Sequence, residues 1–290
     1  MIKWLVLIAI LFVILIFAKW MKEIHTFQVT KYEIHSPKLK GVSTRKIVFL
    51  SDLHNCSYGK DNEKLLKAVQ QEKPDIILIT GDMLVGKAGA STEIARNFVG
   101  KLPGICKTYY ANGNHEQRMK EDEKKYGTVY KEYKAYLEMC GVCFLENECT
   151  EILWDGHPVK LWGLEIPIKG YGKFNKVSLP ETFMEEIFGI AEKSAYHILL
   201  AHNPLFVKDY LKWGADLILS GHFHGGVVRI PFWRGVISSQ GSFFPKYSGE
   251  LTKEGNASIV VSKGIGLHTI RVRFNNPAEI VVLHFGGSEE

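Results

Sequence analysis

The first hydrophobic feature of the chain is an apolar run over residues 4–18, WLVLIAILFVILIFA, with lysines on both sides. No polar residue interrupts it, so a helix formed by this run has no polar face to turn toward water. Fifteen helical residues span about 22 Å, less than the ~30 Å hydrocarbon core of a bilayer. The flanking lysines, with Trp4 and Trp20, can make up the difference at the two interfaces.

A cleaved signal peptide is the alternative to a membrane anchor, because the run also has the length of a signal-peptide core. The segment that follows, FAKWMKEI, is bulky and charged and contains no small-residue cleavage motif. We therefore expect residues 1–22 to be a retained single-pass anchor that contacts membrane lipid through residues 4–21. Positive charge on both flanks leaves the orientation open.

From residue 46 onward, strand-like and helix-like patterns alternate. Residues 46–51 (KIVFLS) and 75–80 (DIILIT) are short, β-branched apolar runs that are typical of buried strands. Between them, Leu65, Leu66 and Val69 recur at helical spacing within residues 61–73. This order predicts a βαβ unit.

The rest of the chain continues this alternation and ends in a strand-rich part. We predict helices at residues 91–101, 119–140 and 180–193, short strands within 142–163, and strands at 105–111, 197–201, 215–220, 258–262, 269–274 and 279–285. Strand-only and alternating regions must share one core, so the expected fold class is α/β, with two packed mixed β-sheets flanked by helices. Residues 23–45 connect the anchor to this domain and supply a first strand, and the domain itself covers residues 46–290.

Composition and charge exclude few partners. The chain is 46% hydrophobic, which suffices for a large core, and its net charge of +5 is spread along the sequence. Nucleic-acid binding is not expected, because surfaces that follow a phosphate backbone usually carry a concentrated basic stripe. Cys140 and Cys143 have C-x-x-C spacing, but no second such pair completes a zinc site. We interpret them as small apolar residues.

Polar side chains that bind metals follow five of the predicted strands. They are Asp52, His54, Asp82, Asn114, His202, His222 and His224. The carboxyl ends of strands in α/β sheets are where sites are built, so we expect all seven at one edge. In an extended chain, residues two apart point the same way, so Asp52 with His54, or His222 with His224, can reach a common point.

This set of ligands predicts a centre with two divalent ions. Carboxylate, imidazole and amide ligands suit Mn²⁺, Fe²⁺ or Zn²⁺, and seven ligands exceed the need of one ion. Two ions that share a carboxylate generate a bridging hydroxide and stabilise both the attacked phosphate group and the leaving oxygen. The pattern therefore favours phosphoester hydrolysis, with His115 free of the metals and able to protonate the leaving group.

The ordered blocks D-x-H (52–54), G-D (81–82), G-N-H-E (113–116), His202 and G-H-x-H (221–224) resemble the calcineurin-like metallophosphoesterase superfamily. The continuation GHFHGGVVRIPF is similar to a subgroup of membrane-anchored or exported bacterial phosphohydrolases that includes UDP-2,3-diacylglucosamine pyrophosphatase-like enzymes. The resemblance implies a four-layer sandwich, with residues 46–290 as the catalytic domain, and an extracytoplasmic location.

The resemblance also implies how the ligands divide between the ions. Asp52, His54 and His224 would hold one ion. The second ion would be held by Asn114, His202 and His222, and Asp82 would bridge the two. Phe223 and Val227 depart from the family pattern, in which G-H-T-H is usual and Gln often follows the paired glycines. Neither is a ligand, so these departures concern substrate contacts.

Two further features remain open between a functional and a structural interpretation. Arg118 has the chemistry to bind a phosphate in a bidentate manner, but we interpret it as a surface residue of a charged helix. An aromatic group near the GHFHGG block either lines an apolar pocket, dips into lipid, or simply packs within a β-rich region. Its members are Phe232, Trp233, Phe243, Phe244 and Tyr247.

We expect a manganese-dependent phosphohydrolase that cleaves a phosphodiester, pyrophosphate or phosphomonoester bond near a membrane surface. Its substrate would be a phosphorylated small molecule or a lipid-linked phosphate. The alternative is a scaffold that binds metal but does not catalyse, since a fold alone does not establish an activity. The complete ligand set favours the enzyme.

Overall fold

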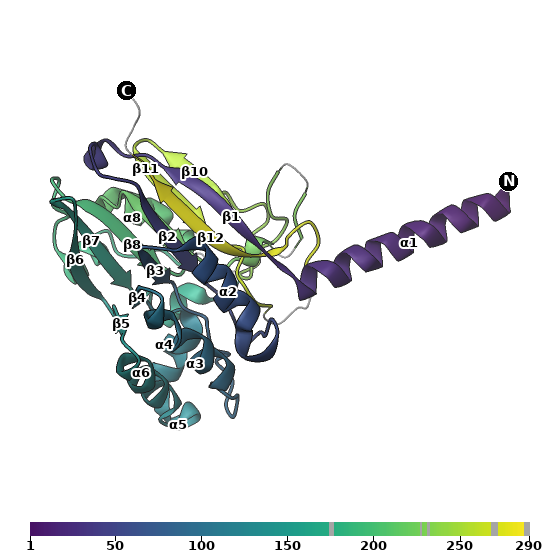
Figure 1. Cartoon of the computed structure of the whole chain (residues 1–290), viewed down its shortest axis with the longest axis horizontal. Helices are drawn as coiled ribbons and strands as arrows, with labels where there is room; N and C mark the ends of the chain where they lie inside the picture. Colours follow the sequence, from purple (N-terminus) through teal and green to yellow (C-terminus); the bar gives the residue numbers. More distant parts are fainter. Residues whose placement is uncertain (174–176, 227, 231–232, 268–271, 287–290) are drawn as a thin grey trace.

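A computed structural model of the chain describes residues 1–173, 177–226, 228–230, 233–267 and 272–286. One long helix, α1 (Ile2–His25), projects from a body of two six-stranded sheets (Figure 1). The first sheet has the order β1 (Phe27–Ile34), β12 (Ala278–Phe285), β2 (Arg45–Leu50), β3 (Ile76–Ile79), β4 (Lys107–Tyr110) and β5 (Val142–Phe144). The second has the order β10 (Leu251–Glu254), β11 (Ala257–Val261), β9 (Leu217–Ser220), β8 (Tyr196–Ala201), β7 (His157–Leu164) and β6 (Glu148–Trp154).

Both sheets are mixed, as predicted. In the first sheet β2, β3, β4 and β5 are parallel neighbours, and β12 runs antiparallel to β2. In the second, β7, β8, β9 and β11 are parallel, with antiparallel strands at both edges. All four residues of β3 and of β9 are buried. These strands are covered on both faces, which is why they lack the polar alternation of a half-exposed strand.

Three apolar layers give the body its four-layer arrangement. Between the sheets pack side chains such as Phe49, Leu200 and Val281. The outer face of the first sheet carries α2 (Glu63–Glu72), α3 (Glu93–Val99), α4 (Asn114–Glu121), α5 (Glu123–Tyr126) and α6 (Val129–Met139). The outer face of the second carries α7 (Phe183–Phe188) and α8 (Val207–Trp213). Figure 1 shows α3, α4, α5 and α6 of the first group together in the lower part of the body.

The structure corrects three of the predicted elements. In place of the helix predicted over residues 180–193 there is only the six-residue α7. The single helix predicted over residues 119–140 is three helices, because Asp122 caps α5 through a bond from the Lys125 N–H and Gly127 has a φ of 63°. The predicted strand 269–274 lies partly outside the described residues. Its described part contributes only an isolated bridge between Phe274 and Val228.

Helix α1 is longer than the apolar run that predicts it. Its 24 residues correspond to about 36 Å. Among the described residues it is the one helix long and apolar enough to cross a membrane, a property shared with signal sequences. Its last turns join the body, since the Glu23 carboxylate accepts a hydrogen bond from the Asn276 N–H at 3.0 Å. The following strand β1 pairs in parallel with β12, so residues 23–45 contribute an edge strand to the first sheet.

Candidate metal centre

The seven predicted ligands follow five strands, six of them in the connecting segments and Asn114 as the first residue of α4. β2, β3 and β4 of the first sheet lead to Asp52 with His54, to Asp82 and to Asn114, and β8 and β9 of the second lead to His202 and to His222 with His224. The site therefore lies where the carboxyl ends of these strands from the two sheets adjoin. Six of the seven are buried, and His224 is partly buried.

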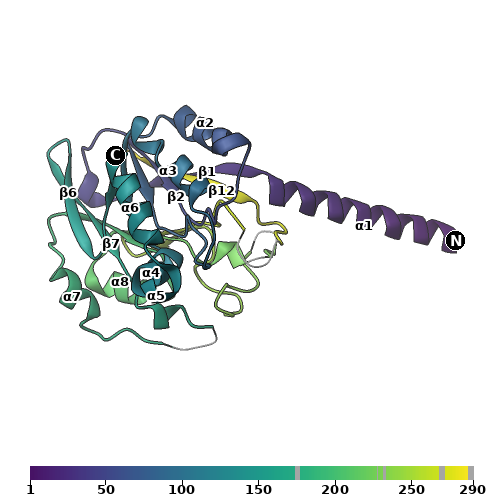
Figure 2. The ribbon, with the colours of Figure 1, turned by 90° about the horizontal axis from the view of Figure 1, so that it is seen from below.

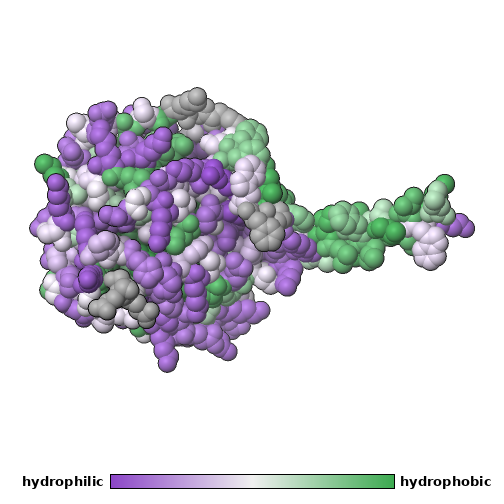
Figure 3. Space-filling model, turned by 90° about the horizontal axis from the view of Figure 1, so that it is seen from above, coloured by the Kyte–Doolittle hydropathy of each residue, from purple (hydrophilic) through white to green (hydrophobic). Residues whose placement is uncertain are grey.

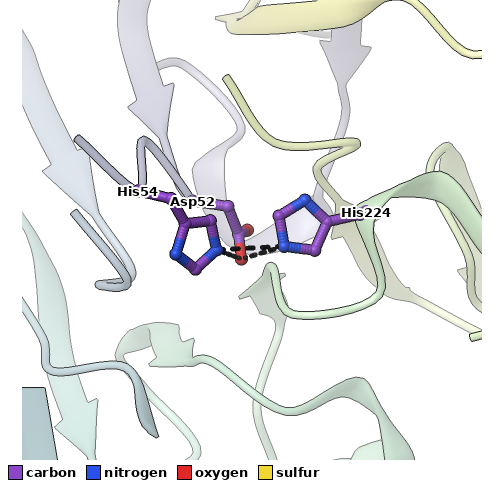
Figure 4. Close-up of side chains that lie close together, drawn as sticks. All are labelled: Asp52, His54 and His224. Atoms are coloured by element: carbon purple, nitrogen blue, oxygen red, sulfur yellow. Dashed lines mark hydrogen bonds and ion pairs between the residues drawn. The ribbon is translucent and has the colours of Figure 1, made fainter. Parts of the chain in front are cut away.

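The first group of possible ligands is Asp52, His54 and His224. Figure 4 shows the three side chains directed at one point. The Asp52 Oδ1 lies 3.6 Å from the His54 Nε2 and 3.3 Å from the His224 Nε2, and the two ring nitrogens are 3.0 Å apart. Ligands about 2.1 Å from one ion are separated by distances of this order. The residues present therefore fit one divalent ion.

The second group is Asp82, His202 and His222. The His202 Nδ1 donates to the Thr80 carbonyl at 2.6 Å, which leaves Nε2 without a proton in the neutral ring and 3.1 Å from the Asp82 Oδ2. The Asn114 Oδ1 and the His222 Nε2 are buried and have no hydrogen-bond partner among the described residues. Buried polar atoms are almost always satisfied, so these two fit the coordination of a second ion.

Asp82 lies between the two groups. Its Oδ2 is 3.1 Å from the His202 Nε2 and 3.9 Å from the His54 Nε2. Its Oδ1 accepts the His115 N–H at 2.8 Å, which fixes the orientation of the carboxylate. One carboxylate is thus within reach of ligands of both groups, as a bridging ligand must be.

The electrostatics of the site favour positive charge. Burial alone would raise the pKa of Asp82, but His202 and His115 outweigh it and hold this pKa well below its ordinary value. Burial likewise opposes ionisation of Asp52, yet His224 and His202 lower its pKa. In return, Asp82 and Asp52 overcome the effect of burial and raise the pKa of His202 to about 9. Two ionised carboxylates inside the protein provide a potential suited to cations.

The backbone of the site is not extended, contrary to the spacing argument from the sequence. Asp52, His54, Asp82, His222 and His224 all have φ between 47° and 65°. Asp52 and His54 do meet, but His222 and His224 belong to different groups. Left-handed backbone at non-glycine residues costs of order 1 kcal/mol each and clusters at functional sites. In the division implied by the family resemblance, too, His224 and His222 serve different ions.

Close packing of the strand-end loops requires glycine at particular positions. A Cβ at Gly221 would lie 2.2 Å from the Asp52 Oδ2, and a Cβ at Gly113 would lie 2.3 Å from the Asp82 Oδ1. Either side chain would displace a carboxylate of the site. These glycines therefore allow the backbone to approach the ligand side chains closely.

His115 lies at the edge of both groups with one ring nitrogen engaged by the protein. The Gly86 N–H donates to its Nδ1 at 2.5 Å, so the neutral ring carries its proton on Nε2. This Nε2 lies 3.8 Å from the Asp82 Oδ2, and the ring lines the cavity of the site. His54, Asp82 and His115 also form a third group within ligand distance. His115 can therefore present a proton donor beside Asp82 at the cavity.

Glu116, the last residue of the G-N-H-E block, has a role that the sequence pattern did not indicate. It is fully buried, and its two oxygens accept hydrogen bonds from the N–H groups of Asp82, Met83, Leu84 and Gly113 and from the Tyr110 hydroxyl, at 2.8–3.2 Å. Burial and the nearby Asp82 raise its pKa. The signal in the sequence was an acidic residue in the first turn of a helix that begins with a ligand.

A cavity of about 270 Å³ opens beside the ligands. Arg118 and Lys173 lie in its wall, which corrects the interpretation of Arg118 as a residue of the outer helix surface. Phe223, Leu267 and Val272 supply apolar wall. The cavity thus combines a cation-binding floor, two basic side chains and an apolar side, and it has the chemistry to accept a phosphate with an organic substituent.

The aromatic group near the GHFHGG block does not line this cavity in the part of the chain that the structure describes. Trp233, Phe243 and Phe244 are exposed, whereas Tyr247 packs against the core of the second sheet. The predictions for Phe232 and Val227 lie outside the described residues. Cys140 and Cys143 are free and only partly buried.

Several known proteins are similar in sequence to this chain over most of its length. The sequence profile of the calcineurin-like phosphoesterase family matches residues 45–226. A metallophosphoesterase of Aquifex aeolicus is 28% identical over 267 residues, covering 91% of this chain and 94% of that protein. The phosphodiesterase YaeI of Escherichia coli is 24% identical over 245 residues, covering 82% and 81%. Among solved structures, the 5′-nucleotidase precursor of Thermus thermophilus has 16% identity and a TM-score of 0.44, covering 75% of this chain and 48% of its own.

Proposed function

Because the chain belongs to the calcineurin-like phosphoesterase family and is a metal-dependent phosphoesterase, we propose that it hydrolyses phosphodiester or pyrophosphate bonds. We propose further that the reaction takes place at a membrane surface and uses two manganese ions. The observation that carries the proposal is the pair of ligand groups around Asp82 in a cavity that also holds Arg118 and Lys173. The apolar side of that cavity supports a phosphate substrate that carries an organic substituent.

We propose the following ligands for the two ions. Asp52, His54 and His224 would hold one ion, and Asn114, His202 and His222 the other, with Asp82 shared. Imidazole, carboxylate and amide donors support Mn²⁺, with Fe²⁺ and Zn²⁺ as the competing ions. When bound, two such ions activate water and neutralise the charge that develops on the phosphate group.

Three side chains at the cavity would contact the substrate directly, to protonate the leaving oxygen and to orient the phosphate. His115 donates the proton on its Nε2 to the leaving oxygen, while the Gly86 N–H keeps the ring in the required tautomer. Arg118 orients the phosphate through its planar, forked N–H groups, and Lys173 adds a second positive charge at the cavity wall. Helix α1, as a retained anchor, holds this cavity near lipid.

The test uses the full chain in lipid nanodiscs after removal of metal with EDTA. We expect titration with Mn²⁺ to bind two ions per chain, measured by elemental analysis, and to restore hydrolysis of bis(p-nitrophenyl) phosphate. Asp82→Ala should bind fewer ions and lose activity by ~100-fold or more. Asp61→Ala is the matched control, since Asp61 is exposed and has a φ of 52° against 51° for Asp82.

The outcomes separate this proposal from its alternatives. Two bound ions with no hydrolysis of the diester, of p-nitrophenyl phosphate or of a dinucleoside pyrophosphate would indicate the non-catalytic scaffold. Hydrolysis of the monoester alone would replace the proposed bond type. Activity that does not depend on any of the three metals would refute the metal mechanism itself.

A further inference from the structure

Four large apolar side chains are exposed on the loop that follows the metal ligands of β9. Ile230, Trp233, Phe243 and Phe244 are 39%, 53%, 69% and 42% exposed, and we refer to them as the apolar rim. The rings of Trp233 and Phe244 stack with their centroids 5.1 Å apart. Single exposed apolar residues are ordinary, but three aromatic rings and an isoleucine gathered in one loop mark an interaction surface.

The loop that carries the apolar rim lies close to the C-terminal end of α1, around residues 19–25, which we call the root of α1. The Arg229 N–H donates to the Phe274 carbonyl at 3.0 Å. On the other side, the Lys19 ammonium lies 5.0 Å from the centre of the Phe274 ring and donates to the Asn275 side chain. Figures 1 and 2 both show the loops of this region at the end of the body from which α1 emerges.

The surface around the root of α1 has the composition of a membrane interface. Figure 3 shows the green, apolar surface of α1 and green side chains on the adjoining part of the body. Exposed basic side chains accompany them, with Lys19 and Lys22 on α1 and Lys246 on the rim loop. Aromatic rings beside lysines are suited to the headgroup region, where rings sit at the interface and lysines meet anionic lipid.

The rim also adjoins the opening of the catalytic cavity. Ser239 lies between Trp233 and Phe243 in the chain and lines that cavity. Val272 also lines the cavity, two residues before Phe274, which contacts α1. A bilayer that met both α1 and the rim would therefore lie at the cavity mouth.

We propose that the apolar rim inserts into the interface of the same bilayer that α1 spans, so that the cavity opens at the depth of the lipid headgroups. The occupant of this surface is lipid and not a protein partner, because the rim continues the apolar and basic surface of the membrane helix itself. The inference rests on the proposed function only in taking α1 as a retained membrane span.

The experiment places a tryptophan on the rim and measures its contact with lipid. The full-length Phe243→Trp variant is assembled into nanodiscs of phosphatidylcholine and phosphatidylglycerol, with and without brominated acyl chains. We expect the fluorescence added by the new tryptophan, relative to wild type, to fall by about half or more in brominated lipid, as for a ring buried at the interface. Leu153→Trp is the matched control, because Leu153 is 65% exposed but lies on β6 at the opposite end of the body. Its added fluorescence should stay unquenched.

A second variant keeps the test decisive if Phe243→Trp disturbs the loop. Trp233→Phe removes a native tryptophan of the apolar rim. The fluorescence that this variant loses relative to wild type should be fluorescence that brominated lipid quenches. Trp20→Phe reports on α1 in the same way. Quenching at Trp20 without quenching at position 243 or Trp233 overturns the rim while leaving the anchor intact. No quenching at Trp20 overturns the anchor.

Discussion

Glu116→Gln tests how far the geometry of the metal centre depends on one buried carboxylate. In the native chain, one oxygen of Glu116 accepts from Met83, Leu84 and Tyr110, and the other accepts from the N–H groups of Asp82 and Gly113. Glutamine preserves the volume but can accept through one oxygen only. Its NH₂ group would then face two N–H donors.

The magnitude follows from the two hydrogen bonds that glutamine cannot replace. Hydrogen bonds to a charged acceptor contribute ~1.5–3 kcal/mol each, so we expect a loss of about 3 kcal/mol or more in the free energy of unfolding. The Asp82 N–H is one of the two donors, so the carboxylate between the ions loses its support. Residues that orient ligands typically change metal affinity by about 10–100-fold, and we expect a Mn²⁺ affinity lowered within this range.

The assay is urea unfolding of the full chain in detergent micelles, followed by tryptophan fluorescence, with calorimetric Mn²⁺ titration of the same samples. Glu121→Gln is the matched control, because it makes the same change on an exposed residue of the same helix. A stability loss below about 1 kcal/mol together with unchanged Mn²⁺ affinity would refute the role assigned to Glu116.

Three further predictions concern the reaction, the packing of the loops and the response to pH. His115→Ala should keep both ions and lower kcat by about 100-fold, with loss of the basic limb of the pH–rate profile, because the ring supplies a proton to the leaving group. Gly221→Ala should lower metal content and cost about 1–3 kcal/mol of stability, since the added Cβ would lie 2.2 Å from the Asp52 Oδ2. Glu146 has a lowered pKa, because hydrogen bonds from Tyr130 and Lys120 outweigh its burial. Its stabilisation is complete above its ordinary pKa of 4.5 and is lost as pH falls through the lowered value. Glu146→Gln should therefore destabilise the protein at pH 7 and destabilise it progressively less as the pH is lowered below 4.5, measured by urea unfolding.

Each of these has a control of the same chemistry elsewhere in the chain. His35→Ala changes an exposed histidine, Gly104→Ala adds a Cβ with no atom within 4 Å, and Glu138→Gln changes an exposed carboxylate. Loss of ions from His115→Ala would assign that ring to the metals instead of the leaving group. Full metal content in Gly221→Ala would contradict the close packing at Asp52. Destabilisation by Glu146→Gln that stays constant as the pH is lowered would contradict the charged state of Glu146.

The positions of the strands were predictable because a strand buried on both faces appears in the sequence as a short, continuous apolar run. The strands predicted at residues 46–51 and 75–80 correspond to β2 and β3, and each boundary differs from the prediction by one residue. The helix over residues 119–140 was not resolved into three, because apolar spacing continues across Asp122 and Gly127 while the backbone changes direction there. Periodicity reports which side chains are buried, and it is insensitive to a turn that preserves the buried face.

The chemistry of the centre was determined by the sequence, since Asp, His and Asn after consecutive buried strands must meet wherever those strand ends meet. Only the tertiary structure decided how they are shared: left-handed backbone at His222 and His224 sends the two rings to different groups, although extended spacing predicts one. It also decided that Arg118 faces the cavity and that the loop after β9 exposes aromatic rings beside the root of α1. These features depend on contacts between segments far apart in the chain, and local pattern carries no information about such contacts.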